Sequence, residues 1–250
     1  MMKSVTVVIP CYNAEKYIDA AIQSVKHQTY PNIRIIAVDD KSTDSTIEKV
    51  SNRSGVTVIQ HPNNEGACSA TETGFEESIT DYTCMLAADD AYIDPEHISK
   101  QVKYMEEHTL DWSYDGIMRV GPVPRISTVV NTNWFGHFIF DNLLLDLAPK
   151  FCCLLMIRRN PVNSSSMMIR TEAFRKYNLS WCPKIRSVCD GYLIADMLLK
   201  GLRGGAMSNG GVFYRIHPEQ ISNTALHKEL NRKFRWWILR RLMKRLYPFY

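Results

Sequence analysis

The sequence predicts an α/β fold in which a mostly parallel sheet is flanked by helices. Apolar segments alternate with segments of helical spacing four times within the first ninety residues. Such an alternation favours parallel strands joined by right-handed crossovers. The first apolar run, residues 5–9, is a continuous β-branched stretch rather than an alternating one, as expected for a strand buried on both faces.

Local patterns then predict the individual elements in order. We expect strands at residues 5–9, 33–38, 56–59 and 82–87, and helices at 14–27, 46–51 and 67–78. Ser42 or Thr43 is a candidate cap for the second helix. After Pro95 we expect helices at 98–107, 171–177 and 190–200, and strands at 112–120, 165–170 and 212–216. Residues 121–160 are expected to cover the edge of the sheet.

Composition and charge exclude several classes of protein. Apolar residues make up 45% of the chain and charged residues 22%, which is ordinary for a globular domain. Seven basic residues and no acidic residue lie in 231–250, so residues 1–230 hold 23 basic and 26 acidic residues and carry a net charge of −3. We expect no nucleic-acid partner, because binding phosphates requires clustered bases on the domain.

The cysteine pattern and the apolar windows favour a cytoplasmic protein. The seven cysteines are odd in number and include no CxxC pair, which favours reduced thiols. The first ten residues lead directly into a predicted strand and show no signal-peptide pattern. The most apolar long window, residues 138–157, contains Asp141, Asp146 and Lys150, so it is a poor membrane span.

Polar and acidic residues follow the predicted strands at the point where each strand ends. Tyr12-Asn13 follows the first strand, Asp39-Asp40 the second and Asp89-Asp90 the fourth. Ligands of parallel sheets bind outside the carboxyl ends of the strands. Each acidic pair alone could simply support a helix N-terminus.

Two acidic pairs at one edge of a sheet would repel each other unless a cation or ligand compensated their charge. Magnesium and manganese prefer oxygen ligands and commonly share them with diphosphate oxygens and water. The edge therefore predicts a nucleoside-diphosphate ligand held through Mn²⁺ or Mg²⁺. The sequence contains neither GxxxxGK[ST] nor a GxGxxG after the first strand, so a P-loop enzyme and an ordinary dinucleotide dehydrogenase are not expected.

Seven short motifs follow one another along the chain: VVIPCYN at 7–13, QTYPN at 28–32, AVDDKSTD at 37–44, NEG at 64–66, ADD at 88–90, CD at 189–190 and YRIH at 214–217. In their order and spacing, over residues 4–222, the chain resembles the family 2 glycosyltransferases, which are inverting enzymes with the GT-A fold. This resemblance implies a domain over residues 1–222. Its nucleotide-sugar half would span about 1–95 and its acceptor half about 96–222, with a tail at 223–250.

The resemblance also implies roles for residues around the donor. Pro10 and Tyr12 would line the pocket for the base and ribose, with Asn13 beside them. Asp40 would accept a hydrogen bond from the base, most often uracil, and Asp89 would contact the ribose.

Four further residues would act on the diphosphate and the acceptor. Asp90 would bind the metal that bridges the two phosphates, and Arg215 and His217 would contact a phosphate. A packing or structural role is about equally consistent with the sequence for these last two. Asp190 would be the general base for the acceptor hydroxyl; the alternative is that it caps a helix beginning at Gly191.

The chain departs from the family pattern at four places. Lys41 stands where a glycine is usual, and Thr71 and Glu72 stand where the family commonly has Arg and Asn. Ala88 occupies the first position of the DxD triplet, which leaves Asp89 and Asp90 as the possible ligands. Cys189 replaces a glutamate and leaves Asp190 as the base candidate.

The tail predicts a basic amphipathic helix. Phe234, Ile238, Leu242 and Leu246 are spaced by four residues, and most of the bases lie on the opposite face. This pattern is typical of a helix at a membrane interface, and a terminal helix packed on the domain is the alternative. Membrane contact would suit a lipid-linked acceptor.

These observations together predict an inverting, metal-dependent glycosyltransferase. It would move a sugar from a nucleotide-diphosphate donor, a UDP-sugar by analogy, to a hydroxyl of a glycan or lipid-linked glycan. The first rival is a non-catalytic sugar-nucleotide-binding module of the same fold. A sugar-phosphate nucleotidyltransferase is a second rival, but it would need a glycine-rich basic loop after the first strand, and residues 11–15 offer none.

Overall fold

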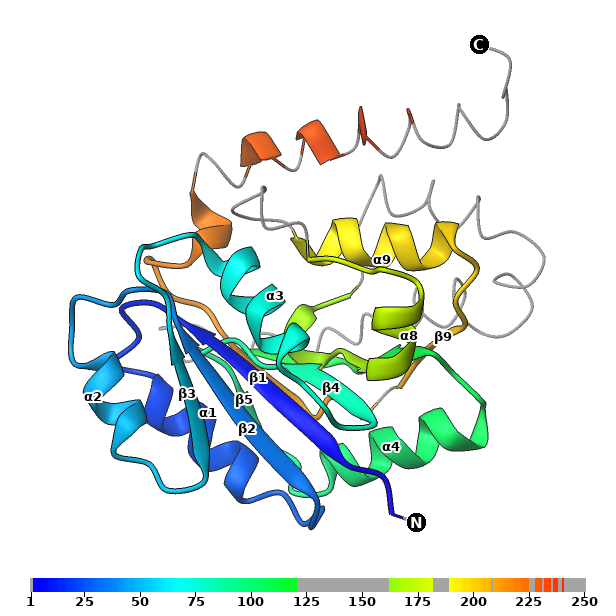
Figure 1. The fold of residues 1–250 in the computed structure, drawn as a ribbon, viewed down its shortest axis with the longest axis horizontal. Coiled ribbons are helices and arrows are strands. Elements are labelled where there is room, and N and C mark those ends of the chain that lie inside the picture. Colours follow the sequence, from blue (N-terminus) through cyan, green and yellow to red (C-terminus); the bar gives the residue numbers. More distant parts are fainter. Residues whose placement is uncertain are drawn as a thin grey trace.

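The computed structural model describes residues 2–120, 162–181, 189–207 and 209–224, together with short helical pieces at 228–230, 232–234 and 236–237 and residue 240. The segment 121–160, expected at the sheet edge, lies outside the described residues, as does most of the tail beyond 237. The described chain forms a mixed α/β fold around a seven-stranded, mostly parallel sheet (Figure 1), as predicted.

The large sheet has the strand order β3-β2-β1-β4-β8-β6-β9. Its strands are β1 (Val5–Cys11), β2 (Ile33–Asp39), β3 (Val56–Gln60), β4 (Tyr82–Met85), β6 (Trp112–Tyr114), β8 (Met168–Arg170) and β9 (Gly204–Ala206). Strands β1 to β4 are parallel, and β8 runs antiparallel to both β4 and β6. A small second sheet has the order β5-β10-β7, with β5 (Ala91–Tyr92), β7 (Ile117–Val120) and β10 (Val212–Arg215).

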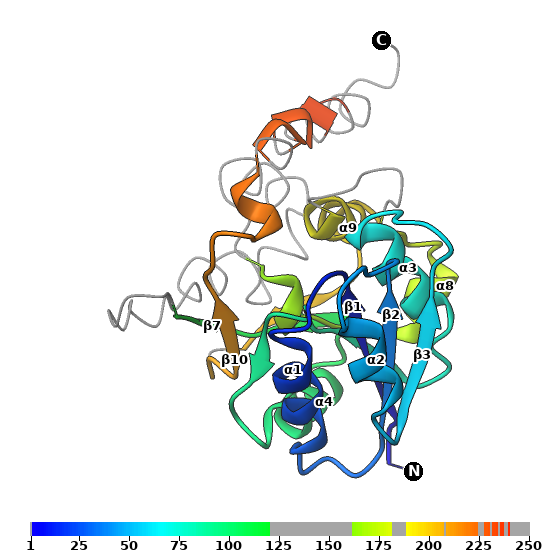
Figure 2. The same cartoon turned by 90° about the vertical axis from the view of Figure 1, so that its left-hand side faces the viewer.

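Helices cover both faces of the large sheet. The α-helices are α1 (Ile18–Lys26), α2 (Thr46–Ser51), α3 (Ala67–Glu76), α4 (His97–Glu107), α8 (Thr171–Lys176) and α9 (Cys189–Leu199), and short 3-10 helices lie at Ser164–Ser166 and Ile221–Asn223. Alternate residues of β1 point to opposite faces, so Val7 packs in the core beneath α1 and α4 while Val8 packs in the core beneath α3 and α9 (Figures 1 and 2).

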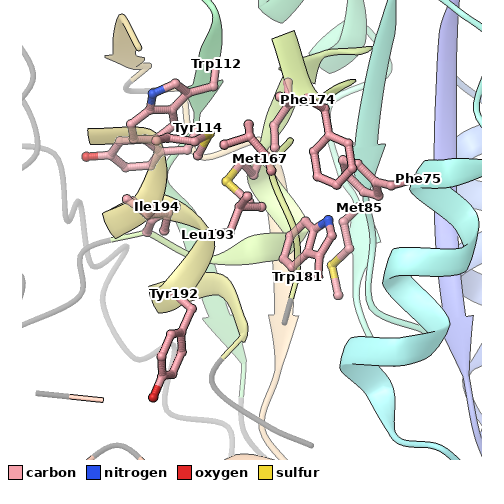
Figure 3. Close-up of a cluster of buried hydrophobic side chains, with 14 of the residues drawn as sticks. Phe75, Met85, Trp112, Tyr114, Met167, Phe174, Trp181, Tyr192, Leu193 and Ile194 are labelled. Atoms are coloured by element: carbon pink, nitrogen blue, oxygen red, sulfur yellow. The ribbon is translucent and has the colours of Figure 1, made fainter. Parts of the chain in front are cut away.

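The core beneath α9 is rich in aromatic side chains (Figure 3). Trp112 and Trp181 are completely buried in it, and Phe75 packs edge-on against Trp181 with their ring centroids 5.1 Å apart. These two tryptophans therefore belong to the core and do not form a surface for stacking a sugar.

The elements of the first ninety residues match the prediction closely, and the later ones match it less well. The expected strand 112–120 breaks at Asp115-Gly116 into β6 and β7, which belong to different sheets. Neither Ser42 nor Thr43 caps α2; Asp44 accepts the Thr46 amide at 3.0 Å instead. Strands β5 and β9 were not expected.

The described part of the tail is helical, and its apolar side packs on the domain. Phe234 is 4% exposed within the core that contains α9, and Leu230 and Trp237 pack against the same core. Arg232 and Trp236 are exposed on the outer side. The alternative interpretation of the tail, a helix packed on the domain with a solvated basic face, therefore holds for these residues. Among the described residues, no helix combines the length and apolarity needed to cross a bilayer.

Candidate active site

The candidate site lies where the order of the strands reverses in the large sheet. Strand β2 pairs with one side of β1 and β4 with the other, so the carboxyl ends of β1 and β4 flank a topological switch point. The pairing of β1 with β4 ends at Val8 and Met85, whereas the pairing with β2 continues through Pro10 to Cys11. Pro10 therefore lies beyond the last residue of β1 that pairs with β4 and is still paired with β2.

The acidic pair after β2 holds a neighbouring loop. Asp40 is 2% exposed, and its Oδ1 accepts hydrogen bonds from His61 Nδ1 and from the Glu65 amide, both at 2.9 Å. Its Oδ2 accepts the Gly66 amide at 2.7 Å. A carboxylate offers about four lone-pair directions, so one remains for a base N–H. The base contact of Asp40 stays a prediction.

Loops after β1 and β2 are tied together by short polar contacts. Asn13 accepts the Thr43 amide at 2.9 Å through its side-chain oxygen and donates its own amide to Ser42 Oγ at 3.0 Å. Asn13 and Lys41 both have left-handed backbones, with φ of 48° and 64°. Lys41 therefore holds a conformation that glycine adopts without steric cost. Tyr12, at 48% exposed, is available at the surface of this loop.

The acidic pair after β4 is bound by residues from the second half of the chain. Asp90 is 2% exposed; its Oδ2 accepts Ser165 Oγ at 2.5 Å and its Oδ1 accepts the Arg215 amide at 3.1 Å. Ser165 Oγ also accepts the Ala87 amide at 3.1 Å. Burial, and then the charge of Asp89, raise the pKa of Asp90 to about 7.

Arg215 and His217 meet Asp89 on the other side of this pair. His217 Nε2 lies 2.9 Å from Asp89 Oδ2, and Arg215 Nε donates to the Asp89 carbonyl at 3.1 Å. The Tyr17 ring orients both side chains, because its centroid is 5.1 Å from Arg215 Cζ and 4.9 Å from the His217 ring. The structure thus brings together four predicted residues that are up to 128 positions apart in sequence.

The sequence did not indicate the contacts that Ser165 and Tyr17 make in the site. The serine run 164–166 suggests either a place near the acceptor side or a plain turn, and the contact of Ser165 with Asp90 spans 75 positions. Tyr17 is expected on the apolar side of the helix at 14–27. Both residues are identified by contacts with residues far away in the sequence, and local sequence patterns do not reveal such contacts.

The two carboxylates after β4 form a ligand set that fits a hard cation. The described residues contain no group of three His, Cys, Asp or Glu side chains placed to hold a metal ion on their own. Magnesium and manganese are usually bound through one or two carboxylates, with substrate phosphates and water completing the shell. The raised pKa of Asp90 is consistent with such a site, since a nearby positive charge would relieve its repulsion from Asp89.

Asp190 lies in the first turn of α9, on the same side of the sheet as α3. Its Oδ1 accepts the amide of Gly191 at 2.7 Å, and it is the second residue of the helix rather than the residue before it. The thiol of Cys189 hydrogen-bonds to that of Cys68, which lies in the first turn of α3. The described cysteines Cys11, Cys68, Cys84 and Cys189 are all free thiols, as predicted.

Thr71 and Glu72, which stand where the family commonly has Arg and Asn, make hydrogen bonds to the backbone of the protein. Thr71 is fully buried and donates to the carbonyl of Ala67 at 2.8 Å. Glu72 accepts the amide of Trp181 at 2.6 Å, and burial raises the pKa of its carboxyl group. This turn of α3 therefore presents no cation to the site, and among the described residues Arg215 brings a guanidinium group to the acidic pair.

Solved structures of proteins that bind nucleotide sugars share this fold. The structure of S. aureus TarS 1–349 in complex with UDP-GlcNAc matches with a TM-score of 0.69 at 17% identity, over 98% of this chain and 73% of that one. A mannosyltransferase from Pyrobaculum calidifontis in complex with GDP-Man and Mn²⁺ matches with a TM-score of 0.67 at 13% identity, over 96% of this chain and 65% of that one.

Sequence comparison identifies the family. The chain is 33% identical over 234 residues to WfaP of Escherichia coli, a UDP-Glc:α-D-GlcNAc-diphosphoundecaprenol β-1,3-glucosyltransferase, and the match covers 93% of this chain and 84% of WfaP. The matches to several other curated relatives cover less than half of the length of those proteins. The model of glycosyl transferase family 2 matches residues 6–164. The chain therefore belongs to glycosyl transferase family 2.

Proposed function

We propose that this glycosyltransferase transfers a sugar, with inversion, from a UDP-sugar to a hydroxyl of a glycan or lipid-linked glycan. One observation carries the proposal: Asp89 and Asp90 meet Arg215 and His217 at the carboxyl edge of the sheet. The relatives add support, because WfaP uses UDP-Glc and a diphosphoundecaprenol-linked acceptor and the TarS structure contains UDP-GlcNAc.

In this proposal the nucleoside lies over the ends of β1 and β2. Pro10 and Tyr12 flank the base and ribose, with Asn13 holding their loop. Asp40 accepts a hydrogen bond from the base, and the His61 contact fixes the orientation of its carboxylate. Asp89 contacts the ribose.

The diphosphate lies against the acidic pair after β4. Asp90 would hold Mn²⁺ or Mg²⁺, which when bound neutralises charge on the departing diphosphate as a Lewis acid. Arg215 and His217 supply donors on the opposite side. The donor half (about 1–95) thus receives two residues from the acceptor half (about 96–222).

Asp190 acts as the general base in this scheme. It takes the proton of the acceptor hydroxyl while the oxygen forms a bond to the anomeric carbon and the bond to the diphosphate breaks. Attack from the face opposite the leaving group inverts the configuration. A positioned base contributes roughly 10²–10⁴ in rate.

The tail, residues 223–250, is proposed to contact an anionic membrane at the cytoplasmic face, where a lipid-linked acceptor would be presented. Arg232, Lys233 and Arg240 are exposed, and Trp236 beside them is 67% exposed. Because Phe234 is already buried, the described part of the tail would bind through charge and through Trp236 rather than through its apolar side.

The experiment compares Asp190→Asn with Asp196→Asn, which removes a charge elsewhere on α9. UDP release is measured from a panel of UDP-sugars with polyprenyl-diphosphate-linked sugars as acceptors and Mn²⁺ present. We expect Asp190→Asn to lower kcat roughly 10²–10⁴-fold while UDP still raises the melting temperature. Asp196→Asn should keep its turnover.

Two results would contradict the proposal. Wild-type turnover in Asp190→Asn would remove Asp190 as the base. UDP-sugar binding without turnover of any donor and acceptor by the wild type would favour the alternative, a non-catalytic sugar-nucleotide-binding module.

A further inference from the structure

The described part of the tail lies over α9, the helix that carries the proposed base (Figures 1 and 2), and it contacts Tyr192 near the first turn of that helix. Phe234 is 4% exposed and belongs to the same buried cluster as Tyr192 and Leu193 of α9. The ring centroids of Phe234 and Trp237 lie 4.7 and 4.6 Å from that of Tyr192. The contact is therefore an aromatic cluster shared by the tail and α9.

Gly191 makes room for the Phe234 ring. A Cβ added at position 191 would lie 2.8 Å from Phe234 Cε1 and 2.9 Å from its Cζ. Gly191 has no left-handed backbone that would require a glycine, and glycine weakens a helix relative to alanine. The close approach of the aromatic ring is thus the physical reason for a glycine at this position.

The ring contacts the backbone beside the proposed base. Asp190 is bonded covalently to Gly191, and its Oδ1 also accepts the Gly191 amide at 2.7 Å. Any shift of Gly191 therefore moves the Asp190 carboxylate with it. Displacing a reacting group by about 1 Å can cost about 10²-fold in rate.

We infer that Phe234 is a positioning residue: its ring on Gly191 fixes the orientation of Asp190 toward the acceptor hydroxyl. The inference rests on the proposed function of Asp190. By this inference the tail helix is part of the acceptor side of the site. The segment that is proposed to contact the membrane would then also influence the catalytic step.

The first test compares Phe234→Ala with Glu229→Gln in the full chain. Glu229 lies on the same tail but its side chain is exposed. We expect Phe234→Ala to lower kcat about 10-fold to 10²-fold, with the KM for the UDP-sugar and the UDP-induced rise in melting temperature unchanged. Glu229→Gln should keep the wild-type kcat, and Phe234→Leu should keep most of the activity that Phe234→Ala loses.

A double-mutant cycle of Gly191→Ala and Phe234→Ala gives the second test. Gly191→Ala alone should lower kcat, because its methyl group collides with the ring. Gly191→Ala combined with Phe234→Ala should be no slower than the worse single variant, since the methyl group then occupies space that the ring has left.

Specific results would overturn the inference. One is a wild-type kcat in Phe234→Ala. Another is a double variant whose loss of kcat equals the product of the losses in Gly191→Ala and Phe234→Ala. The third is a loss of UDP binding that parallels the loss of kcat. Failure of the proposed function is distinguishable, because it would show as full turnover in Asp190→Asn or as no turnover by the wild type, whatever the Phe234 variants do.

Discussion

Asp90 and Asp115 are two buried carboxylates whose surroundings act on them in opposite ways. Burial and the neighbouring Asp89 raise the pKa of Asp90. Asp115 is equally buried, and burial alone would raise its pKa. The contact with His97 and the amide donors of Gly211 and Gly116 lower the pKa below its ordinary value instead. Asp115 is thus compensated by the fold itself, whereas Asp90 is not.

Asp115 fixes the loop that leads into β10, and we predict that Asp115→Asn weakens it. Its carboxylate accepts the amides of Asn209, Gly210 and Gly211 at 2.8 to 3.2 Å. An asparagine would turn an NH₂ group toward these donors. We expect a loss of about 1–3 kcal/mol in the free energy of unfolding at pH 7, measured by urea denaturation, with Asp111→Asn as the control.

The pH dependence of this loss follows from the lowered pKa of Asp115. A carboxyl group with a depressed folded-state pKa stabilises fully above its ordinary value of 3.8. That stabilisation is lost as the pH falls through the lower folded-state value. The stability difference between wild type and Asp115→Asn should therefore shrink below pH 4. A difference that stayed constant down to pH 3 would show that the charge of Asp115 contributes nothing.

Some residues of the site could be predicted from the sequence and others could not. The aspartates after β2 and β4 were predictable because strand ends and acidic pairs are local features. Ser165 was not, because a serine triplet has the same local appearance whether or not it meets a carboxylate 75 positions away. Lys41 stood out only as a departure from the family pattern, and the structure shows a left-handed backbone there.

At the scale of elements, the regular βα units were predictable and the short strands were not. The β-branched run at residues 5–9, which lies within β1, favours a strand because such side chains pack well on a pleated surface. In contrast, β9 is the segment Gly204–Ala206, which has low strand propensity. It pairs with β6, and the lack of a side chain at Gly204 leaves room for the Trp112 ring. Packing of a bulky neighbour, which sequence patterns do not reveal, decides that element.

The tail was predictable as an amphipathic helix, but the partner of its apolar side was not. We predict that its exposed bases bind vesicles containing anionic lipid, with a contribution of about 1 kcal/mol for each base near the surface. The combined substitution of Arg232, Lys233 and Arg240 by glutamate should abolish co-sedimentation with such vesicles, and added salt should weaken wild-type binding.

The matched control for the tail is Lys103→Glu on α4, which changes a remote exposed base. It should sediment like the wild type. Equal binding of wild type and the triple variant to anionic vesicles would contradict a membrane role for the tail, and the basic face would then be a solvated surface only.

At the scale of the whole molecule, the site collects residues from both halves of the chain. Strand ends near residues 10–13, 39–40 and 89–90 come from the regular parallel half, and β10 brings Arg215 and His217 to them from the other. The first group follows from local pattern and topology. The second depends on how β10 joins the small sheet beside β5, which the sequence alone did not indicate.

A crystal structure of the protein with a UDP-sugar and Mn²⁺, with the metal located by its anomalous signal, tests the account most directly. We predict an anomalous peak within coordination distance of the Asp90 carboxylate, bridged to both phosphates, with Asp190 facing the anomeric carbon. The proposed metal site at Asp90 would be contradicted if the nucleotide bound without a metal peak at this edge, while Asp90 kept only its contacts with Ser165 and the Arg215 amide.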